Sequence, residues 1–285
     1  MSTPFGDLPT EYCDYAQSAV VVLPIPYDGT STWGKGADHG PEALLEASAN
    51  MELYDIETDS EPYRVGIYTA DPLTESASPE AMVKAGEAAV SRLLDDGKFV
   101  VSIGGEHSVT VGPVRAHAAK YPGMTVLQID AHTDLRDEYE GTPYNHACVM
   151  ARVQELCPIV QVGIRSMDAS EKKNLPEGRV FWAHQIVGNS DWEQRAIDLL
   201  TDDVYITIDL DGFDPSIVPS TGTPEPGGLE WHPTMRFLRR IFESRRVVGF
   251  DIVELCPTPH ERASAFLAAK LLYRMLAFKY HKQLR

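Results

Sequence analysis

The chain has 285 residues, of which 43% are hydrophobic and 24% are charged, proportions that exclude a collagen-like, low-complexity or largely disordered protein. It carries 42 Asp and Glu against 25 Lys and Arg, a formal net charge of −17. Such a surface repels nucleic acid phosphates and anionic lipid headgroups, so we expect neither nucleic acid nor a membrane among the partners. It would attract cations, either metal ions or cationic metabolites, although acidity that serves only solubility is the alternative.

The cysteines and the N-terminus indicate a cytoplasmic protein. The four cysteines form no C-x-x-C pair, and a chain of this size needs no disulfide framework, so we expect reduced thiols. Residues 1–17 are acidic and lack the apolar core of a signal peptide. No apolar stretch approaches the length that crosses a membrane, and Lys270 and Arg274 interrupt the C-terminal one.

Short β-branched runs alternate with amphipathic stretches along the whole chain. Ser78 and Pro79 predict the start of a helix that ends at Gly97; another helix runs to about Ala119, and a long one covers about 261–280. Strands are predicted at 19–25, 65–68, 99–103, 125–129, 159–164, 180–182, 204–208 and 247–252. This alternation predicts the α/β class, a three-layer α/β/α fold with a mostly parallel sheet of about eight strands, as one domain over residues 1–285.

Three of the predicted strands end in side chains that can bind metal ions. Residues two apart on an extended chain point the same way, so the side chains of each motif can converge at the carboxyl edge of the sheet. Carboxylates mixed with imidazoles favour Mn²⁺ over Mg²⁺ or structural Zn²⁺. Six ligands exceed the need of one catalytic ion, so we expect two ions that share a water and lower its pKa. The candidate ligands are His107, Asp130, His132, Asp134, Asp209 and Asp211.

Each motif alone has another explanation. The Asp209-Leu210-Asp211 pair could be a capping or solvated pair, and Gly-Gly-Glu-His could be a turn with a core histidine. The combination at three strand ends favours metal binding, because the grouped acids would stay unpaired without a cation. We expect packing or surface roles for the histidines outside these motifs and their neighbours, namely His39, His117, His184, His232, His260 and His281.

The sequence resembles the ureohydrolases, the arginase and agmatinase family of binuclear manganese amidinohydrolases. The resemblance runs from about Val20 to Leu276 and is strongest in specific motifs. These are PYDGTSTWGKGADHGPEALLEAS at 26–48, GGEHS at 104–108, DAHTD at 130–134, DLDGFDPSIVPSTGTPEPGGL at 209–229 and GFDIVELCP at 249–257.

The resemblance implies a role for each candidate residue. His107 and Asp134 would hold one Mn²⁺, His132 and Asp211 the other, and Asp130 and Asp209 would bridge the two ions of each subunit. A hydroxide between the ions would attack the guanidinium carbon. Glu254 would bind the guanidinium nitrogens, and His146 would pass a proton to the leaving amine. Without the resemblance, His146 could equally cap a helix, and Glu254 could be a salt-bridge partner at a strand end.

The substrate is predicted from the residues around the expected mouth of the site. The stretch 140–147 lacks the S-G-N-L-H-G loop with which arginases read an amino acid, and GIRS at 163–166 resembles agmatinases. An acidic rim favours a substrate tail that ends in an amine, although Arg136 or Arg165 could receive a carboxylate. Further candidate substrate-binding residues are Tyr144, Asn145, Asp168 and Thr223, and the role of Asp251 stays open.

We therefore predict hydrolysis of a small cationic guanidino substrate, agmatine or N1-aminopropylagmatine, to urea and putrescine or spermidine, a step of polyamine biosynthesis. Arginase, guanidinobutyrase and formiminoglutamase are the alternatives on the same fold. A metal-dependent deacetylase with one Zn²⁺ and a catalytically silent scaffold are alternatives of other classes. The second D-x-D set and Glu254 argue against the deacetylase, and the presence of all six candidate ligands argues against the scaffold. The resemblance also implies a homo-oligomer, a trimer or hexamer.

Overall fold

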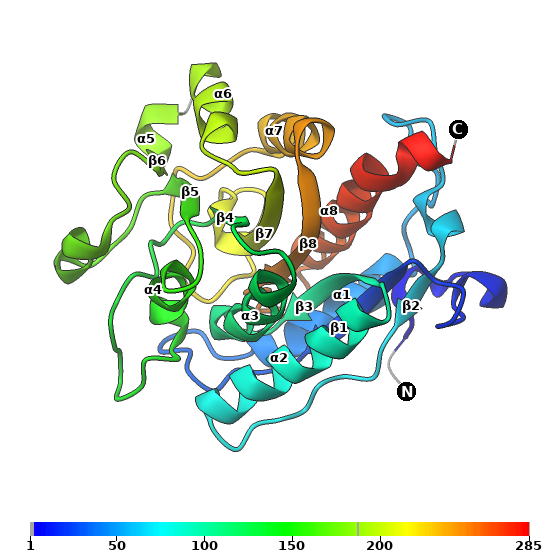
Figure 1. The fold of residues 1–285 in the computed structure, drawn as a ribbon, viewed down its shortest axis with the longest axis horizontal. Helices are drawn as coiled ribbons and strands as arrows, with labels where there is room; N and C mark the ends of the chain where they lie inside the picture. The colour runs from blue at the N-terminus through cyan, green and yellow to red at the C-terminus, as the bar shows by residue number, and fades with distance from the viewer. Residues whose placement is uncertain (1–2, 187, 285) are drawn as a thin grey trace.

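The computed structural model describes residues 3–186 and 188–284, and a single parallel sheet forms the centre of this part of the chain. The strand order is β2-β1-β3-β8-β7-β4-β5-β6, with every pairing parallel (Figure 1). The strands are β1 (Val20–Ile25), β2 (Ile67–Thr69), β3 (Phe99–Gly104), β4 (Thr125–Ile129), β5 (Ile159–Ile164), β6 (Val180–Trp182), β7 (Asp203–Asp209) and β8 (Arg246–Val253). The predicted α/β class and parallel sheet are confirmed.

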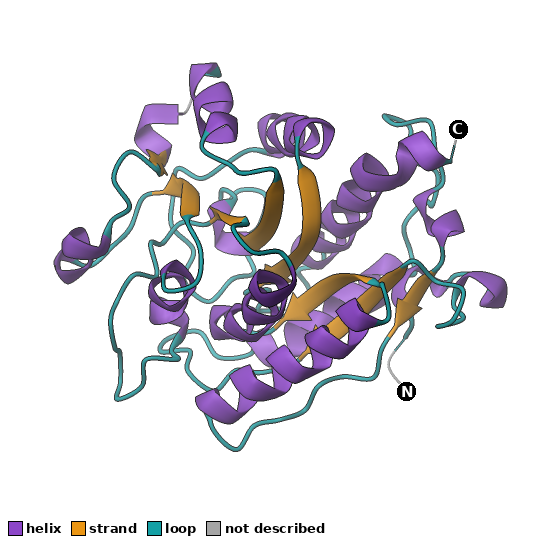
Figure 2. Cartoon of the chain, in the orientation of Figure 1, coloured by secondary structure: helices purple, strands orange, loops and turns teal. Residues whose placement is uncertain are grey.

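Helices cover both faces of the sheet, so the fold has three layers with the sheet in the middle (Figure 2). They are α1 (Gly40–Ser48), α2 (Pro79–Asp95), α3 (Val111–Lys120), α4 (Val149–Gln154), α5 (Ala183–Ile186), α6 (Asp191–Asp198), α7 (Trp231–Ser244) and α8 (Ala263–Tyr280). One apolar cluster joins the sheet to α1, α6, α7 and α8, and a second joins it to α2, α3 and α4. Among the described residues, no helix combines the length and the apolar character needed to cross a membrane.

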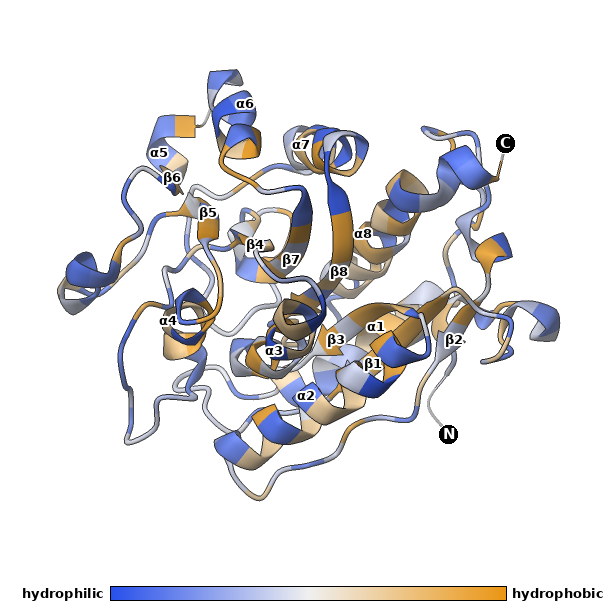
Figure 3. Ribbon diagram, viewed as in Figure 1, coloured by the Kyte–Doolittle hydropathy of each residue, from blue (hydrophilic) through white to orange (hydrophobic). Residues whose placement is uncertain are grey.

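The central strands are apolar on both faces because helices cover both faces. Val101 and Ile103 of β3 belong to one apolar cluster, whereas Val100, the residue before Val101, belongs to the other. Figure 3 shows the same pattern, with hydrophobic strands enclosed by helices whose hydrophilic residues face outward. The predicted start of α2 is confirmed, since Ser78 Oγ accepts a hydrogen bond from the backbone N–H of Ala81 at 3.1 Å.

Several predicted strand boundaries differ from the structure by one residue, and the starts of one strand and one helix are shifted by two. The second strand begins at Ile67 rather than at Val65, because Pro62–Val65 form a 3₁₀ turn and Gly66 takes φ 79°. The last helix begins at Ala263 rather than at Glu261, whose carboxylate instead accepts the backbone N–H of Ser264 at 3.1 Å. Both shifts arise from local hydrogen bonds at the ends of elements.

Candidate active site

The topology brings four strand ends together at one edge of the sheet. Strands β3, β8, β7 and β4 are neighbours in that order, although they are far apart in sequence. Because all run in the same direction, the residues that follow them meet at the carboxyl edge, where ligands bind in such sheets. His107 follows β3, Glu254 follows β8, Asp209 and Asp211 end or follow β7, and Asp130, His132 and Asp134 follow β4.

The first group of candidate ligands surrounds one ring nitrogen. Nδ1 of His107 lies 3.0 Å from Oδ2 of Asp134, 3.2 Å from Oδ2 of Asp130 and 3.4 Å from Oδ2 of Asp209. All four side chains are buried, and Nδ1 of His107 has no hydrogen-bond partner. His107, Asp130 and Asp134 form a group of side chains that can bind a metal ion, and Asp209 lies beside it.

The second group adjoins the first through Asp130. Nδ1 of His132 lies 3.1 Å from Oδ2 of Asp211 and 3.7 Å from Oδ1 of Asp130. Asp130 thus presents one oxygen to each histidine, as a bridging carboxylate would. Asp209 faces the first group with Oδ2, while its Oδ1 accepts the backbone N–H of Asp211 at 2.9 Å.

The electrostatics of the two groups call for a cation. Burial, together with the charges of Asp211 and Asp130, raises the pKa of Asp209 well above its usual range. Burial and the neighbouring Asp130 raise the pKa of Asp134 to about 7. Burial opposes a charge on His132, yet the carboxylates of Asp211, Asp130 and Asp134 together outweigh burial and raise the pKa of His132 to about 11. Metal ions would satisfy this crowding of buried charge, so the donor set fits them.

Buried partners behind the ligands set their orientation. Oγ1 of Thr207 lies 2.6 Å from Oδ1 of Asp251 and 2.9 Å from Nε2 of His107. The hydroxyl proton goes to the carboxylate, so Thr207 accepts from Nε2–H of His107, which leaves Nδ1 free to bind a metal ion. Asp251 therefore supports His107 rather than Glu254. Gln128 acts similarly on the neighbouring strand, since its Nε2 donates to Oδ2 of Asp130 at 2.6 Å.

Sequence reasoning missed Thr207 and Gln128, although a signal was available. Each lies two residues before a ligand, Asp209 or Asp130, and residues two apart on a strand share a face. The pairing of Thr207 with Asp251 is set by the register of β7 against β8, which the sequence pattern alone does not show.

The two residues expected to act on the substrate line the same cavity as the ligands, a hollow of about 240 Å³. Glu254 adopts a left-handed backbone with φ 64°, and its Oε1 accepts the backbone N–H of His107 at 2.8 Å. His146 places Nδ1 2.8 Å from the carbonyl oxygen of Thr30. Burial, with smaller effects from the charges of His107 and His132, lowers the pKa of His146 to about 4.

The other predicted substrate contacts have different outcomes. Asp168 and Thr223 line the cavity. Tyr144 and Asn145 are absent from its lining, so the geometry does not support the contacts expected for them. The hydroxyl of Tyr144 accepts from Nη2 of Arg115 at 2.9 Å, and Oδ1 of buried Asn145 caps the short turn His146–Cys148. Local turn geometry thus directs both side chains away.

The two arginines that could have received a carboxylate are otherwise engaged. Arg165 donates to backbone carbonyl oxygens, among them those of Asp211 at 2.6 Å and Glu225 at 2.8 Å, and is not in the cavity lining. Arg136 lines the cavity, but it lies over the ring of Tyr139 and within 3.9 Å of the Asp168 carboxylate. The remaining lining residues not predicted from the sequence are Thr32, Tyr139, Ala147, Ser166, Met167 and Glu171.

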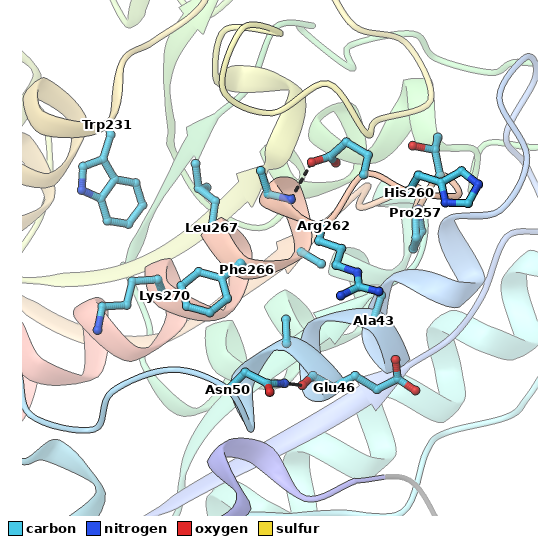
Figure 4. Close-up of a pocket in the computed structure, with 15 residues that line it drawn as sticks. Ala43, Glu46, Asn50, Trp231, Pro257, His260, Arg262, Phe266, Leu267 and Lys270 are labelled. Atoms are coloured by element: carbon cyan, nitrogen blue, oxygen red, sulfur yellow. Dashed lines mark hydrogen bonds between the residues drawn. The ribbon is translucent and has the colours of Figure 1, made fainter.

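A second hollow of about 940 Å³ lies between α1, α7 and the start of α8 (Figure 4). Phe266, Leu267 and Trp231 supply apolar surface there, with Glu46 and Arg262 among the charged groups. In the described ranges, both groups of side chains that could hold a metal ion have members in the lining of the smaller cavity, and neither has one in the lining of the larger. The smaller cavity is therefore the candidate active site.

Comparison with known proteins agrees with this geometry. The model of the arginase family matches residues 18–277. An N(1)-aminopropylagmatine ureohydrolase of Synechocystis sp. is 46% identical over 280 residues, covering 93% of this chain and 90% of the relative. An agmatinase of Pyrococcus horikoshii is 33% identical, covering 95% and 94%. The crystal structure of the agmatine ureohydrolase of Thermoplasma volcanium superposes with a TM-score of 0.85 at 34% identity, covering 95% of this chain and 93% of that one. The chain therefore belongs to the arginase family and is an enzyme of the ureohydrolase type.

Proposed function

We propose that this enzyme hydrolyses the guanidinium group of N1-aminopropylagmatine or agmatine, releasing urea and spermidine or putrescine. One observation carries the choice among guanidino compounds: among the described residues, the cavity lining offers no unpaired arginine or lysine for a carboxylate. Arg165 is engaged by backbone carbonyls, and Arg136 lies between Asp168 and Glu171. Arginine, guanidinobutyrate and formiminoglutamate all carry a carboxylate, whereas the two proposed substrates end in amines.

We propose two Mn²⁺ ions per subunit as the cofactor. His107 and Asp134 would hold one ion and His132 and Asp211 the other, with Asp130 and Asp209 between them. The contact of Asp130 with both histidines supports this division. When bound, such a pair lowers the pKa of a water molecule so that hydroxide is available near neutral pH.

Glu254 and His146, beside the candidate ligands, would bind the substrate and transfer a proton. The Glu254 carboxylate would accept hydrogen bonds from the guanidinium and hold its carbon toward the ligand groups. The oxygen of a water molecule adds to that carbon and becomes the oxygen of urea, the protons of the water are released, and the bond from carbon to the alkyl nitrogen breaks. His146 would give a proton to the departing nitrogen through Nε2, since Nδ1 is engaged by the carbonyl of Thr30. Urea and a free amine are the products.

The relative that is 46% identical supports N1-aminopropylagmatine as the first choice of substrate. We further propose that residues 1–285 act as one domain, as a homo-oligomer in the cytoplasm, at a step of polyamine biosynthesis. The four cysteines, none of which is paired in a disulfide, are compatible with a reducing compartment.

The test is a comparison of substrates. Protein loaded with Mn²⁺ is incubated separately with N1-aminopropylagmatine, agmatine, arginine and guanidinobutyrate, and urea is measured. We expect either amine-tailed substrate to exceed arginine by at least about a hundredfold in kcat/KM, because a carboxylate would meet an acidic rim without a partner. The proposal is wrong if arginine or guanidinobutyrate is the best of the four.

A further inference from the structure

Two hydrogen bonds tie His146 to Thr30, a buried residue 116 positions earlier in the chain. The carbonyl oxygen of Thr30 lies 2.8 Å from Nδ1 of the His146 ring, and Oγ1 of Thr30 accepts the backbone N–H of His146 at 3.0 Å. A carbonyl can only accept, so Nδ1 carries the proton in this contact. The ring and the backbone of His146 are therefore both held by one residue.

The hydroxyl of Thr30 is itself held by a buried carboxylate. Oγ1 of Thr30 lies 2.9 Å from Oε1 of Glu106, a side chain that is 0% exposed. Glu106 also accepts from the backbone N–H of Ser108 at 2.8 Å and from its hydroxyl at 2.7 Å. Because the single hydroxyl proton of Thr30 goes to Glu106, the lone pairs of Oγ1 remain for the N–H of His146. The backbone N–H of His146, the hydroxyl of Thr30 and the carboxylate of Glu106 thus form one directed chain of donors and acceptors, and Ser108 donates to the same carboxylate.

This chain gives a role to the part of the GGEHS motif that the metal site does not use. Glu106 directly precedes the candidate ligand His107, yet its two carboxylate oxygens accept hydrogen bonds from Thr30 and Ser108. The backbone N–H of His107 meanwhile binds Glu254. One tight turn thus supports a metal ligand, the proposed guanidinium-binding carboxylate and, through Thr30, the proposed proton donor.

We propose that Thr30 is a positioning residue for His146. Its carbonyl restricts proton exchange to Nε2, and its hydroxyl, aligned by Glu106, holds the His146 backbone so that Nε2 stays directed into the cavity. Proton transfer to the leaving nitrogen depends on such placement, because a donor must lie within hydrogen-bond reach of its acceptor. The inference rests on the proposed function, in which His146 protonates the departing amine.

The direct test replaces Thr30 by a residue of the same shape without the hydroxyl. We expect Thr30→Val to lower kcat about tenfold or more, with KM and Mn²⁺ content unchanged, because substrate binding and the metal ligands do not involve the hydroxyl. Thr30→Ser, which restores the hydroxyl, should return most of kcat. Thr125→Val is the matched control: Thr125 is also buried, but its hydroxyl bonds Thr201 at the far end of β4. Thr30→Ala removes the same hydroxyl and replaces the valine variant if that one does not fold.

A double-mutant cycle separates positioning from general damage. A residue that acts only through His146 should cost nothing once His146 is removed, so Thr30→Val should leave the residual kcat of His146→Ala unchanged. An equal loss in both backgrounds, or no loss in the wild-type background, would overturn the proposal. The cycle is run on whichever guanidino compound the wild-type enzyme cleaves fastest. A wrong choice of substrate under the proposed function therefore shows in the wild-type comparison and leaves this test intact.

Discussion

The backbone N–H of His107 donates a 2.8 Å hydrogen bond to Oε1 of Glu254, so a candidate metal ligand and the proposed guanidinium-binding carboxylate share one contact. The backbone N–H of Glu254 in turn donates to the carbonyl of Gly105 at 2.8 Å. These two bonds hold Glu254 in its left-handed conformation at the end of β8. Hydrogen bonds to backbone atoms of Gly105 and His107 therefore fix the position of the Glu254 carboxylate relative to the candidate metal ligands.

Glu254→Gln should lower kcat/KM by a factor equivalent to about 2–4 kcal/mol, because the variant removes the charge that pairs with a guanidinium. Metal content should stay at the wild-type level, since Glu254 is not a proposed ligand. Steady-state kinetics and elemental analysis measure the two quantities. Glu243→Gln, in an exposed ion pair on α7, is the control. Loss of metal from the Glu254 variant would contradict the assigned role.

Asp209→Asn should lower activity by orders of magnitude and deplete bound Mn²⁺. Its Oδ2 lies 3.4 Å from Nδ1 of His107, and an amide is a weaker ligand than a carboxylate. Active wild-type protein should hold two ions per chain by elemental analysis, with Mn²⁺ giving the highest activity. A single Zn²⁺ per chain at full activity would refute the binuclear site, and near-normal turnover of the variant would remove Asp209 from it.

Thr207→Val should weaken the binding of metal about ten- to a hundredfold, because His107 would lose the acceptor that keeps the proton on Nε2. Calorimetric titration of the apoprotein with Mn²⁺ measures the affinity for the metal without reference to activity. Thr207→Ser keeps the hydroxyl and should bind metal almost as the wild type does. If valine and serine variants bind equally well, Thr207 does not orient His107.

Stability should fall in weak acid, in part because of His117. This histidine packs beneath Gly249 and Tyr205, and burial lowers its pKa to about 4 from the usual 6.5. Above pH 6.5 both folded and unfolded states are neutral, whereas below it only the unfolded state takes up the proton. The contribution of His117 therefore lowers the free energy of unfolding by about 2 kcal/mol between pH 7 and pH 5.

Urea denaturation at pH 7 and pH 5, compared between wild type and His117→Gln, measures that contribution. The difference in unfolding free energy between the two pH values should be smaller in the variant by about 2 kcal/mol, because glutamine does not titrate. Equal pH dependence in the two proteins would show that His117 is not buried as a neutral group.

Much of the site was predictable from the sequence because its chemistry is local. Asp130, His132 and Asp134 lie on one short extended segment, so their alternation alone indicates convergence. The parallel sheet followed from the alternation of strands and helices, and a parallel sheet places strand ends at one edge. Residue type, spacing and the position after a strand were sufficient for the six candidate ligands to be recognised.

Only the tertiary structure decided which distant partners act on those residues. The register of β7 against β8 sets Thr207 beside Asp251, and the parallel pairing of β3 with β8 brings His107 to Glu254. Thr30 and Arg165 show the same dependence. Thr30 forms hydrogen bonds with His146 and Glu106, and Arg165 donates to backbone carbonyl oxygens. Hydrogen bonds between segments 44 to 147 residues apart leave no periodic trace in the sequence, because they depend on how the strands are ordered rather than on the spacing within any one of them.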